Sequence, residues 1–324
     1  WRRRSSSSDE PTGGERAVRG LAFALIILAN LIGGSTYLAQ KLALEGLPAA
    51  TVTALRNGIA MLCLMAWAAR SGGLRLRFTA REHGRLALIG VLGYALPLLL
   101  GIWGLRGSTA GNASILILLE PPSIMLFACL LLGERIRWLQ GAGLLAGLAG
   151  ALWIVVGDPG QGASLGELVA GRYLGGNATL ALHGVLWGLY SPLMIPLART
   201  HRPADVTFAA MLWGMLLLVP AALLEAGEWH GGPTLAPALV WTLALGVVGS
   251  FGGTFLWVEA LRHLDGSTVA PFVFLQPLAG VLAGHLVLNE QLSGAALAGG
   301  ALIAAGVLLV IAPSRRRTAA DAAG

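Results

Sequence analysis

Residues 104–134 read GLRGSTAGNASILILLEPPSIMLFACLLLGE, and residues 260–290 read ALRHLDGSTVAPFVFLQPLAGVLAGHLVLNE. The two stretches align without a gap at an offset of 156 positions, and the identities continue beyond them. The matches are Leu105/Leu261, Arg106/Arg262, Pro121/Pro277, Glu134/Glu290, Gly143/Gly299 and Gly150/Gly306. Each copy is an apolar segment that a proline interrupts and a glutamate closes. This repetition predicts a chain built from two related halves, each with a broken helix at the same place.

The composition indicates a helical membrane protein. The chain of 324 residues is 56% hydrophobic and 12% charged, whereas soluble domains carry about 25% charged residues. The net charge of +6 does not indicate a nucleic-acid partner, because the basic residues fall in short loops between apolar segments. The two cysteines, Cys63 and Cys129, lie inside apolar segments and offer neither a disulfide framework nor a zinc site.

Ten segments are long enough to cross a bilayer, which takes about 20 apolar residues. They are residues 21–43, 50–69, 86–105, 109–132, 139–156, 173–197, 206–224, 239–261, 267–288 and 294–312. The sequence therefore predicts an all-α, polytopic membrane protein with one five-helix repeat at 21–156 and a second at 173–312. Residues 1–20 would be a disordered tail rather than a cleaved signal peptide, because the apolar segment that follows is too long. A linker at 157–172 and a tail at 313–324 complete the chain.

The Lys and Arg residues predict the orientation. With ten spans both tails lie on one side, and that side receives all but Lys41, Arg56, Arg106 and Arg172 of the 22 basic residues. The positive-inside rule therefore makes both tails cytoplasmic and the linker external. Because each half has five spans, the second half enters from the opposite side and the repeat is inverted.

Two sets of residues carry a resemblance to a known family. The run Gly33-Gly34-Ser35-Thr36-Tyr37, followed by Lys41, Pro48 and Arg56, resembles the start of an EamA repeat, and residues 104–150 resemble its end. Two such units in ten spans resemble the drug/metabolite transporter superfamily, including its YddG-like amino-acid exporters. The chain departs from the pattern at Ile32, where the family usually has the Trp seen here at Trp187. It departs again at Met211, the counterpart of Arg56.

The resemblance implies a secondary transporter of a bacterial inner membrane that exports small metabolites, amino acids first, by alternating access. Protons are a candidate coupling ion. The sequence contains no P-loop, metal cluster or nucleophile–base arrangement, so we expect neither an enzyme nor a cofactor. An exporter of drugs or other metabolites, a passive facilitator or channel, and a structural or lipid-binding membrane protein remain alternatives.

The broken helices supply the first candidate residues. Pro121 and Pro277 predict bends that serve as gates, with a static kink as the alternative. Directly before them lie Glu120 and Gln276, equivalent across the repeats. A charge at the bilayer centre costs at least about 2.5 kcal/mol, so Glu120 is a candidate to bind a substrate ammonium or carry a proton. The alternative is a purely structural hydrogen bond to a freed carbonyl.

Aromatic and amide side chains are the second group of candidates for binding the substrate, by stacking or by contact with an ammonium group. In the family that the chain resembles, the spans that hold the aromatic residues enclose a central cavity; packing is the alternative for each. The candidates are Tyr37, Tyr94, Trp103, Asn112, Trp187, Tyr190 and Trp257.

Other polar residues favour structural roles. Glu259 is placed to pair with Arg262, and Glu134 and Glu290 are placed to anchor loops at the membrane surface. Arg56 lies deeper in its span, and an internal contact and a substrate carboxylate are equally compatible with its position.

Overall fold

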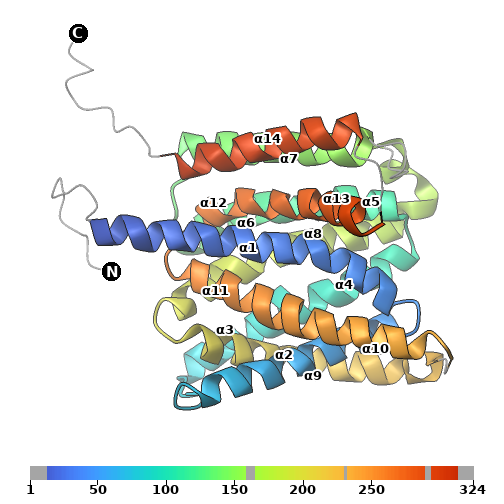
Figure 1. Cartoon of the computed structure of the whole chain (residues 1–324), viewed down its shortest axis with the longest axis horizontal. Helices are drawn as coiled ribbons and strands as arrows, with labels where there is room; N and C mark the ends of the chain where they lie inside the picture. Colours follow the sequence, from blue (N-terminus) through green and yellow to red (C-terminus); the bar gives the residue numbers. More distant parts are fainter. Residues whose placement is uncertain (1–12, 158–164, 230–231, 289–292, 313–324) are drawn as a thin grey trace, which may run out of the picture.

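The computed structural model describes residues 13–157, 165–229, 232–288 and 293–312, and the regular secondary structure of these residues is helical. Long helices lie side by side in one bundle (Figure 1). The first half comprises α1 (Gly13–Ala43), α2 (Ala49–Ala69), α3 (Ala80–Gly90), η1 (Val91–Ala95), α4 (Leu96–Arg106), α5 (Ala110–Leu116), η2 (Ile117–Leu119), α6 (Glu120–Leu132) and α7 (Trp138–Gly157). After η4 (Leu165–Val169) and η5 (Gly171–Tyr173), the second half comprises α8 (Leu174–Ala198), α9 (Pro203–Leu224), η6 (Ala226–Glu228), α10 (Leu235–Ala244), η7 (Leu245–Gly253), α11 (Thr254–Leu261), α12 (Gly266–Val269), η8 (Ala270–Phe274), α13 (Leu275–Leu288) and α14 (Gly294–Ile311).

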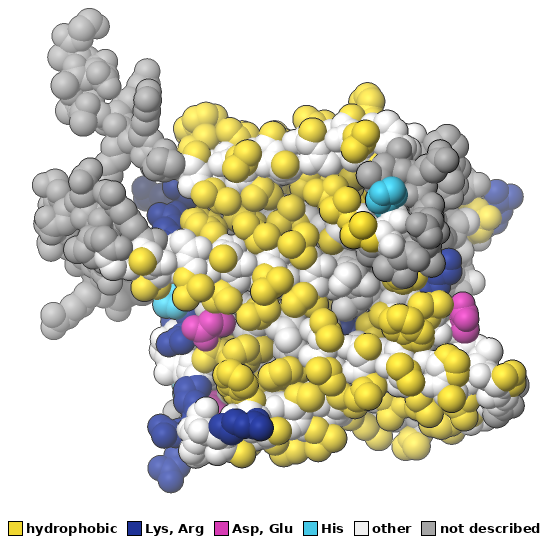
Figure 2. All heavy atoms as spheres, viewed as in Figure 1, with side chains coloured by type: hydrophobic (Ala, Val, Ile, Leu, Met, Phe, Trp, Pro, Cys, Tyr) yellow, Lys and Arg dark blue, Asp and Glu magenta, His cyan; other side chains and the backbone are white. Residues whose placement is uncertain are grey.

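The predicted all-α polytopic fold is confirmed. Within the described residues, nine continuous helical stretches are long and apolar enough to cross a membrane. The shorter apolar stretch Gly266–Leu282 occupies the place of the ninth of the ten predicted spans, and α13 continues it to Leu288. Figure 2 shows hydrophobic side chains across the width of one face, as a lipid-facing surface requires.

Two helices begin earlier than the sequence analysis predicted. α1 starts at Gly13, so the disordered tail predicted for residues 1–20 is too long by the stretch from Gly13; residues 1–12 lie outside the described part. α3 starts at Ala80 rather than near residue 86. Its start is fixed by a capping box in which the Thr79 side chain accepts from the Glu82 amide and Glu82 accepts from the Thr79 amide. Both extensions are polar turns, which an apolar-length criterion overlooks.

The packing of helices against one another obeys an approximate two-fold symmetry. α1 packs on α13 as α8 packs on α6, α2 packs on η7 as α9 packs on η1, and α7 packs on α14. The glycines of the α7–α14 crossing show the antiparallel sense directly. A Cβ at Gly143 would lie 2.7 Å from the carbonyl oxygen of Gly306, and one at Gly150 would lie 2.5 Å from that of Gly299. Since Gly143 matches Gly299 and Gly150 matches Gly306, each half presents the same surface to the other, as an inverted repeat requires.

Four spans are irregular, in matched pairs. The fourth and ninth spans are each broken by a 3₁₀ segment, η2 and η8, immediately before or close to Glu120 and Gln276. The third and eighth spans contain the π-helical segments η1 and η7, and η1 shifted by 156 positions falls inside η7. Irregular turns of this kind are frequent at functional sites. η1 and η7 lie near the middle of their spans, whereas η2 and η8 lie in the first half of theirs, so each kind of irregular turn occurs at matching places in the two halves.

α1 begins and α14 ends at the same end of the bundle, at the left of Figure 1. We call this the tail end and the opposite one the linker end. The dark-blue Lys and Arg side chains on the face shown in Figure 2 gather mainly at the tail end.

Candidate functional site

The two broken spans meet at a pocket. Glu120 and Pro121 from the start of α6 lie on one side of it, and Gln276 and Pro277 from the start of α13 lie on the other. The cavity is small in this conformation, about 20 Å³, which is room for about one water molecule, and the remaining lining residues are Ile117, Leu118, Val273 and Phe274. The residues that the sequence analysis paired across the repeats are therefore brought together around one space.

Glu120 and Gln276 differ in how they are held. Among the described residues, no hydrogen bond or ion pair involves the Glu120 carboxylate, whose side chain is partly exposed at the pocket. Gln276 instead donates from Nε2 to Asn30 Oδ1 at 3.1 Å, and Asn30 donates from Nδ2 to the Ile26 carbonyl at 2.8 Å. The pocket thus combines a fixed amide with a carboxylate that is available to a ligand.

Glycines bring α1 against this site. A Cβ at Gly34 would lie 2.2 Å from the Gln276 carbonyl oxygen, and one at Gly33 would lie 3.3 Å from the Gln276 side chain. A side chain at Gly34 would displace α13, so the Gly33-Gly34 pair explains why α1 can approach the start of the broken helix so closely.

Three of the predicted aromatic residues form one cluster. The Tyr94 ring lies 5.7 Å from Trp187 in an edge-on arrangement and 6.1 Å from Tyr190, and Trp187 lies 6.4 Å from Tyr190. α8 carries Trp187 and Tyr190, and it packs on both α4 and α6. The cluster therefore joins the π segment of the third span to the helix that flanks the Glu120 break.

The other predicted residues lie elsewhere. Trp257 donates from its indole nitrogen to Ser191 at 3.1 Å, and Trp103 has a side chain that is 48% exposed. Asn112 is buried near the linker end and donates to Asn177 Oδ1 at 3.2 Å, apart from the pocket. The backbone of Tyr37 lies in α1, and its side chain is outside the described part of the structure.

The sequence analysis named Tyr94 and Arg56 but missed their polar partners at the π segments, Asn57, Ser250 and Gln40. Tyr94 in η1 donates to Asn57 Oδ1 at 2.7 Å, and its repeat equivalent Ser250 in η7 accepts from Arg56 Nε at 2.7 Å. Arg56 also donates to Gln40 Oε1 at 3.3 Å. The sequence offered one indication of these contacts. Gly93 and Gly249 are equivalent at the offset of 156, and each stands directly before a polar residue, Tyr94 or Ser250.

The structural roles expected for other polar residues agree with the contacts. Glu259 pairs with Arg262 at 2.8 Å. Glu134 accepts from the backbone amides of Gly266 and Ser267 at 2.9 and 2.8 Å and so caps α12, while Glu290 lies outside the described residues. His183 contacts the Pro97 carbonyl oxygen at 2.6 Å.

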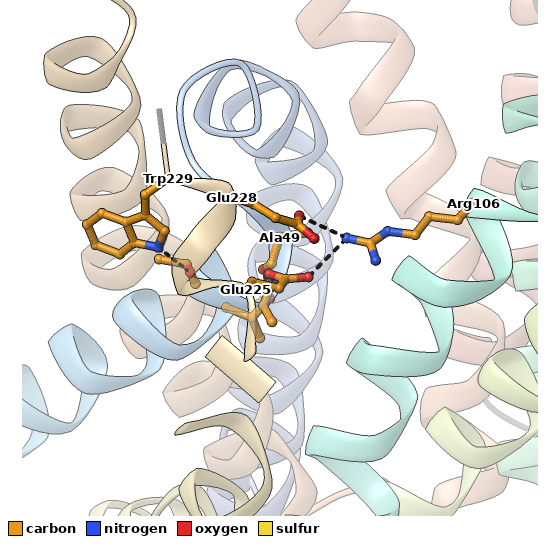
Figure 3. A network of polar contacts seen from close by, with 8 residues as sticks. Ala49, Arg106, Glu225, Glu228 and Trp229 are labelled. Carbon is orange, nitrogen blue, oxygen red and sulfur yellow. Dashed lines mark hydrogen bonds and ion pairs between the residues drawn. The ribbon is translucent and has the colours of Figure 1, made fainter. Parts of the chain in front are cut away.

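A charged network joins three spans at the linker end (Figure 3). Glu225, at the end of α9, lies 3.1 Å from Arg106 Nη2 and accepts from the Ala50 amide at 2.7 Å. Glu228 lies 3.5 Å from the same Arg106 nitrogen, and Trp229 donates to Thr51 at 3.1 Å. These contacts hold the loop after α9 against the start of α2 and the end of α4.

Inverted repeats of apolar helices, broken in matched pairs around a pocket that holds Glu120 and Gln276, are the architecture of a membrane transporter. The model of the EamA-like transporter family matches residues 20–156 and again 174–312, and the chain belongs to that family.

Known proteins support this assignment. The chain is 29% identical over 285 residues to a "probable terminal-alkyne amino-acid exporter" of Streptantibioticus cattleyicolor, covering 88% of this chain and 91% of that protein. It is 28% identical over 303 residues to a "riboflavin transporter" of Rhizobium johnstonii, covering 92% and 90%. A solved crystal structure shares the fold, with a TM-score of 0.76 at 22% identity over 89% of this chain and 95% of that one.

Proposed function

We propose that this protein exports amino acids across a bacterial inner membrane by alternating access. The observation that carries the proposal is the Glu120 carboxylate, which has no partner among the described residues and faces a pocket between two equivalent helix breaks. An unpaired carboxyl group at that depth is costly unless a ligand or a proton compensates it. The relative named as an amino-acid exporter supports the choice of substrate.

In this proposal the substrate ammonium binds Glu120 and the neighbouring Gln276 amide orients the substrate. The aromatic cluster of Tyr94, Trp187 and Tyr190 would contact an apolar or aromatic side chain. Glu120 would release a proton when the ammonium arrives and regain one when it leaves, which would make protons the coupling ion. The Glu120 carboxylate would thus be the group that couples substrate binding to the proton gradient.

The breaks before Pro121 and Pro277 would let one half of each span tilt while the other half stays packed. Tilting in the two repeats would open the pocket to the tail end and the linker end in turn. The gathering of Lys and Arg at the tail end supports a cytoplasmic position for that end.

The proposal is tested with the purified chain in liposomes, using radiolabelled amino acids and riboflavin, with and without a pH gradient. We expect uptake of one or more amino acids that a pH gradient accelerates. Glu120→Gln should abolish the acceleration, whereas Glu45→Gln, which changes an exposed carboxylate in the loop after α1, should leave it intact.

Other results would favour the alternatives. Riboflavin uptake without amino-acid uptake would indicate that the aromatic cluster binds the flat ring system of riboflavin, and it would overturn the choice of an amino-acid substrate. An uptake rate that does not change with the pH gradient, in the unaltered chain and in Glu120→Gln alike, would indicate a passive facilitator. Absence of any uptake would favour a structural or lipid-binding protein.

A further inference from the structure

Arg56 is a cation inside a membrane-spanning helix. It is the eighth residue of α2, so it lies about 10 Å along the helix from the start at Ala49. A charged side chain at such a depth is costly and is kept where it pairs with another group or serves function. The sequence alone left an internal contact and a substrate carboxylate equally open.

Two of the contacts that hold the guanidinium group come from neutral side chains of two other spans. Its Nε donates to Ser250 Oγ in η7 at 2.7 Å, and its Nη1 donates to Gln40 Oε1 in α1 at 3.3 Å. A Cβ at Gly249 would lie 3.6 Å from Nη2. Arg56 is therefore oriented by the π segment of the eighth span, next to a backbone that carries no side chain there.

The second repeat shows that the fold does not need a cation at this place. The equivalent of Arg56, at the offset of 155 seen in the first spans of each half, is Met211. Met211 is 2% exposed in the apolar core, within α9. The five-helix unit therefore packs with an apolar residue here, and the charge belongs to the first half alone.

α1 makes polar contacts both with a residue of the pocket and with Arg56. Asn30 contacts Gln276, and Gln40 contacts Arg56. These two residues of α1 are ten positions apart, which is about 15 Å along the helix. One amino acid cannot span that length with its ammonium and carboxylate groups, so the two positions would contact the substrate at different stages.

We propose that Arg56 binds the carboxylate group of the transported amino acid, at a second site along α1 on the linker side of the Glu120 pocket. A carboxylate would exchange with the Ser250 and Gln40 oxygens as acceptor of the guanidinium hydrogen bonds. The inference rests on the proposed function, because it assumes an amino-acid substrate. In this scheme Glu120 binds the ammonium group of the substrate, and Arg56 selects substrates that carry a carboxylate.

The test compares binding of an amino acid with binding of its carboxamide, which keeps the ammonium group and the side chain but lacks the negative charge. Tritiated L-phenylalanine and L-phenylalaninamide are the first pair, and any other amino acid found by the uptake screen is used with its own amide. Dissociation constants are measured on the purified full chain. We expect the unaltered chain to bind the acid at least tenfold more tightly than the amide.

Arg56→Met, which installs the residue of the second repeat, should bind both compounds equally and with the affinity of the amide. Arg56→Lys should keep part of the preference, and it serves as the second variant if Arg56→Met does not fold. Lys41→Met, which removes an exposed cation next to Gln40, should keep the full preference.

A full preference for the acid in Arg56→Met, or an equal loss of affinity for acid and amide, would overturn the assignment of Arg56. Failure of the unaltered chain to bind or move any amino acid would instead overturn the proposed function, and it is visible without any variant.

Discussion

Gly143 and Gly306 lie backbone against backbone where α7 crosses α14, and a Cβ at either one would lie 2.7 Å from the carbonyl oxygen of the other. The contact recurs with the positions exchanged, since a Cβ at Gly150 would lie 2.5 Å from the Gly299 carbonyl oxygen and one at Gly299 would lie 2.4 Å from that of Gly150. The fifth and tenth spans therefore pack through four symmetric glycines, Gly143, Gly150, Gly299 and Gly306, which we call the glycine seam. A larger residue in the seam would push the two halves apart.

The seam predicts opposite effects for two glycines of α7. Gly150→Ala would push a Cβ to 2.5 Å from the Gly299 carbonyl oxygen, so we expect a lower melting temperature in detergent. At Gly141 the nearest atom to a Cβ is Ile136 Cγ2 at 3.9 Å. Gly141→Ala should therefore leave the melting temperature unchanged or raise it, because alanine is favoured over glycine in helices by about 1 kcal/mol. Equal destabilisation by both changes would contradict the seam.

The linker-end network predicts unequal contributions from its two carboxylates. The Glu225 side chain is 9% exposed and serves both Arg106 and the Ala50 amide, whereas the Glu228 side chain is 57% exposed. Glu225→Gln should lower the free energy of unfolding by about 1–3 kcal/mol, because a buried polar contact is lost. Glu228→Gln should change it by less than about 0.5 kcal/mol.

Hydrogen exchange locates the effect. Glu225→Gln should speed exchange of the Ala50 and Thr51 amides at the start of α2, and Glu228→Gln should not. Similar exchange in both variants would show that Glu225 does not fasten the start of α2.

The cap on α12 gives a third prediction. Glu134 accepts from the Gly266 and Ser267 amides, so Glu134→Ala leaves two donors of a short helix without their partner. We expect a loss of about 1–2 kcal/mol in stability, with faster proteolysis or exchange around residues 264–270. Glu259→Ala removes an ion pair within one turn of α11, and its effect should stay below about 0.5 kcal/mol.

Sequence reasoning found the features that carry a strong local signal. Pro121 and Pro277 marked the two breaks because proline removes a backbone donor, and their shared offset placed them in equivalent spans. The pairing of Glu120 with Gln276 followed from the same offset. The structure adds that both residues line one pocket. The offset alone shows that they are equivalent, and their proximity follows only if the two repeats are inverted and face each other.

The features that were missed depend on contacts between distant spans. The π segments η1 and η7 have no proline to mark them, and only Gly93 and Gly249 hinted at them. The contact between Arg56 and Ser250 joins residues 194 positions apart, and it depends on how α2 crosses η7. Trp103 and Asn112 illustrate the opposite kind of miss. Their residue types suggested a place in the substrate site, but neither lines the pocket.

Proline substitution tests whether the breaks set the rate of transport. Pro277→Ala restores a backbone donor at the start of α13, so the ninth span can become a continuous helix that no longer tilts in two parts. We expect the maximal rate of amino-acid uptake in liposomes to fall several-fold while the concentration for half-maximal uptake changes little, since the Gln276 side chain remains. Pro220→Ala is the matched control, because Pro220 lies inside α9 on an exposed surface away from the pocket. If both variants transport at the rate of the unaltered chain, the break before Pro277 is a fixed kink, and the gate must be sought in the π segments instead.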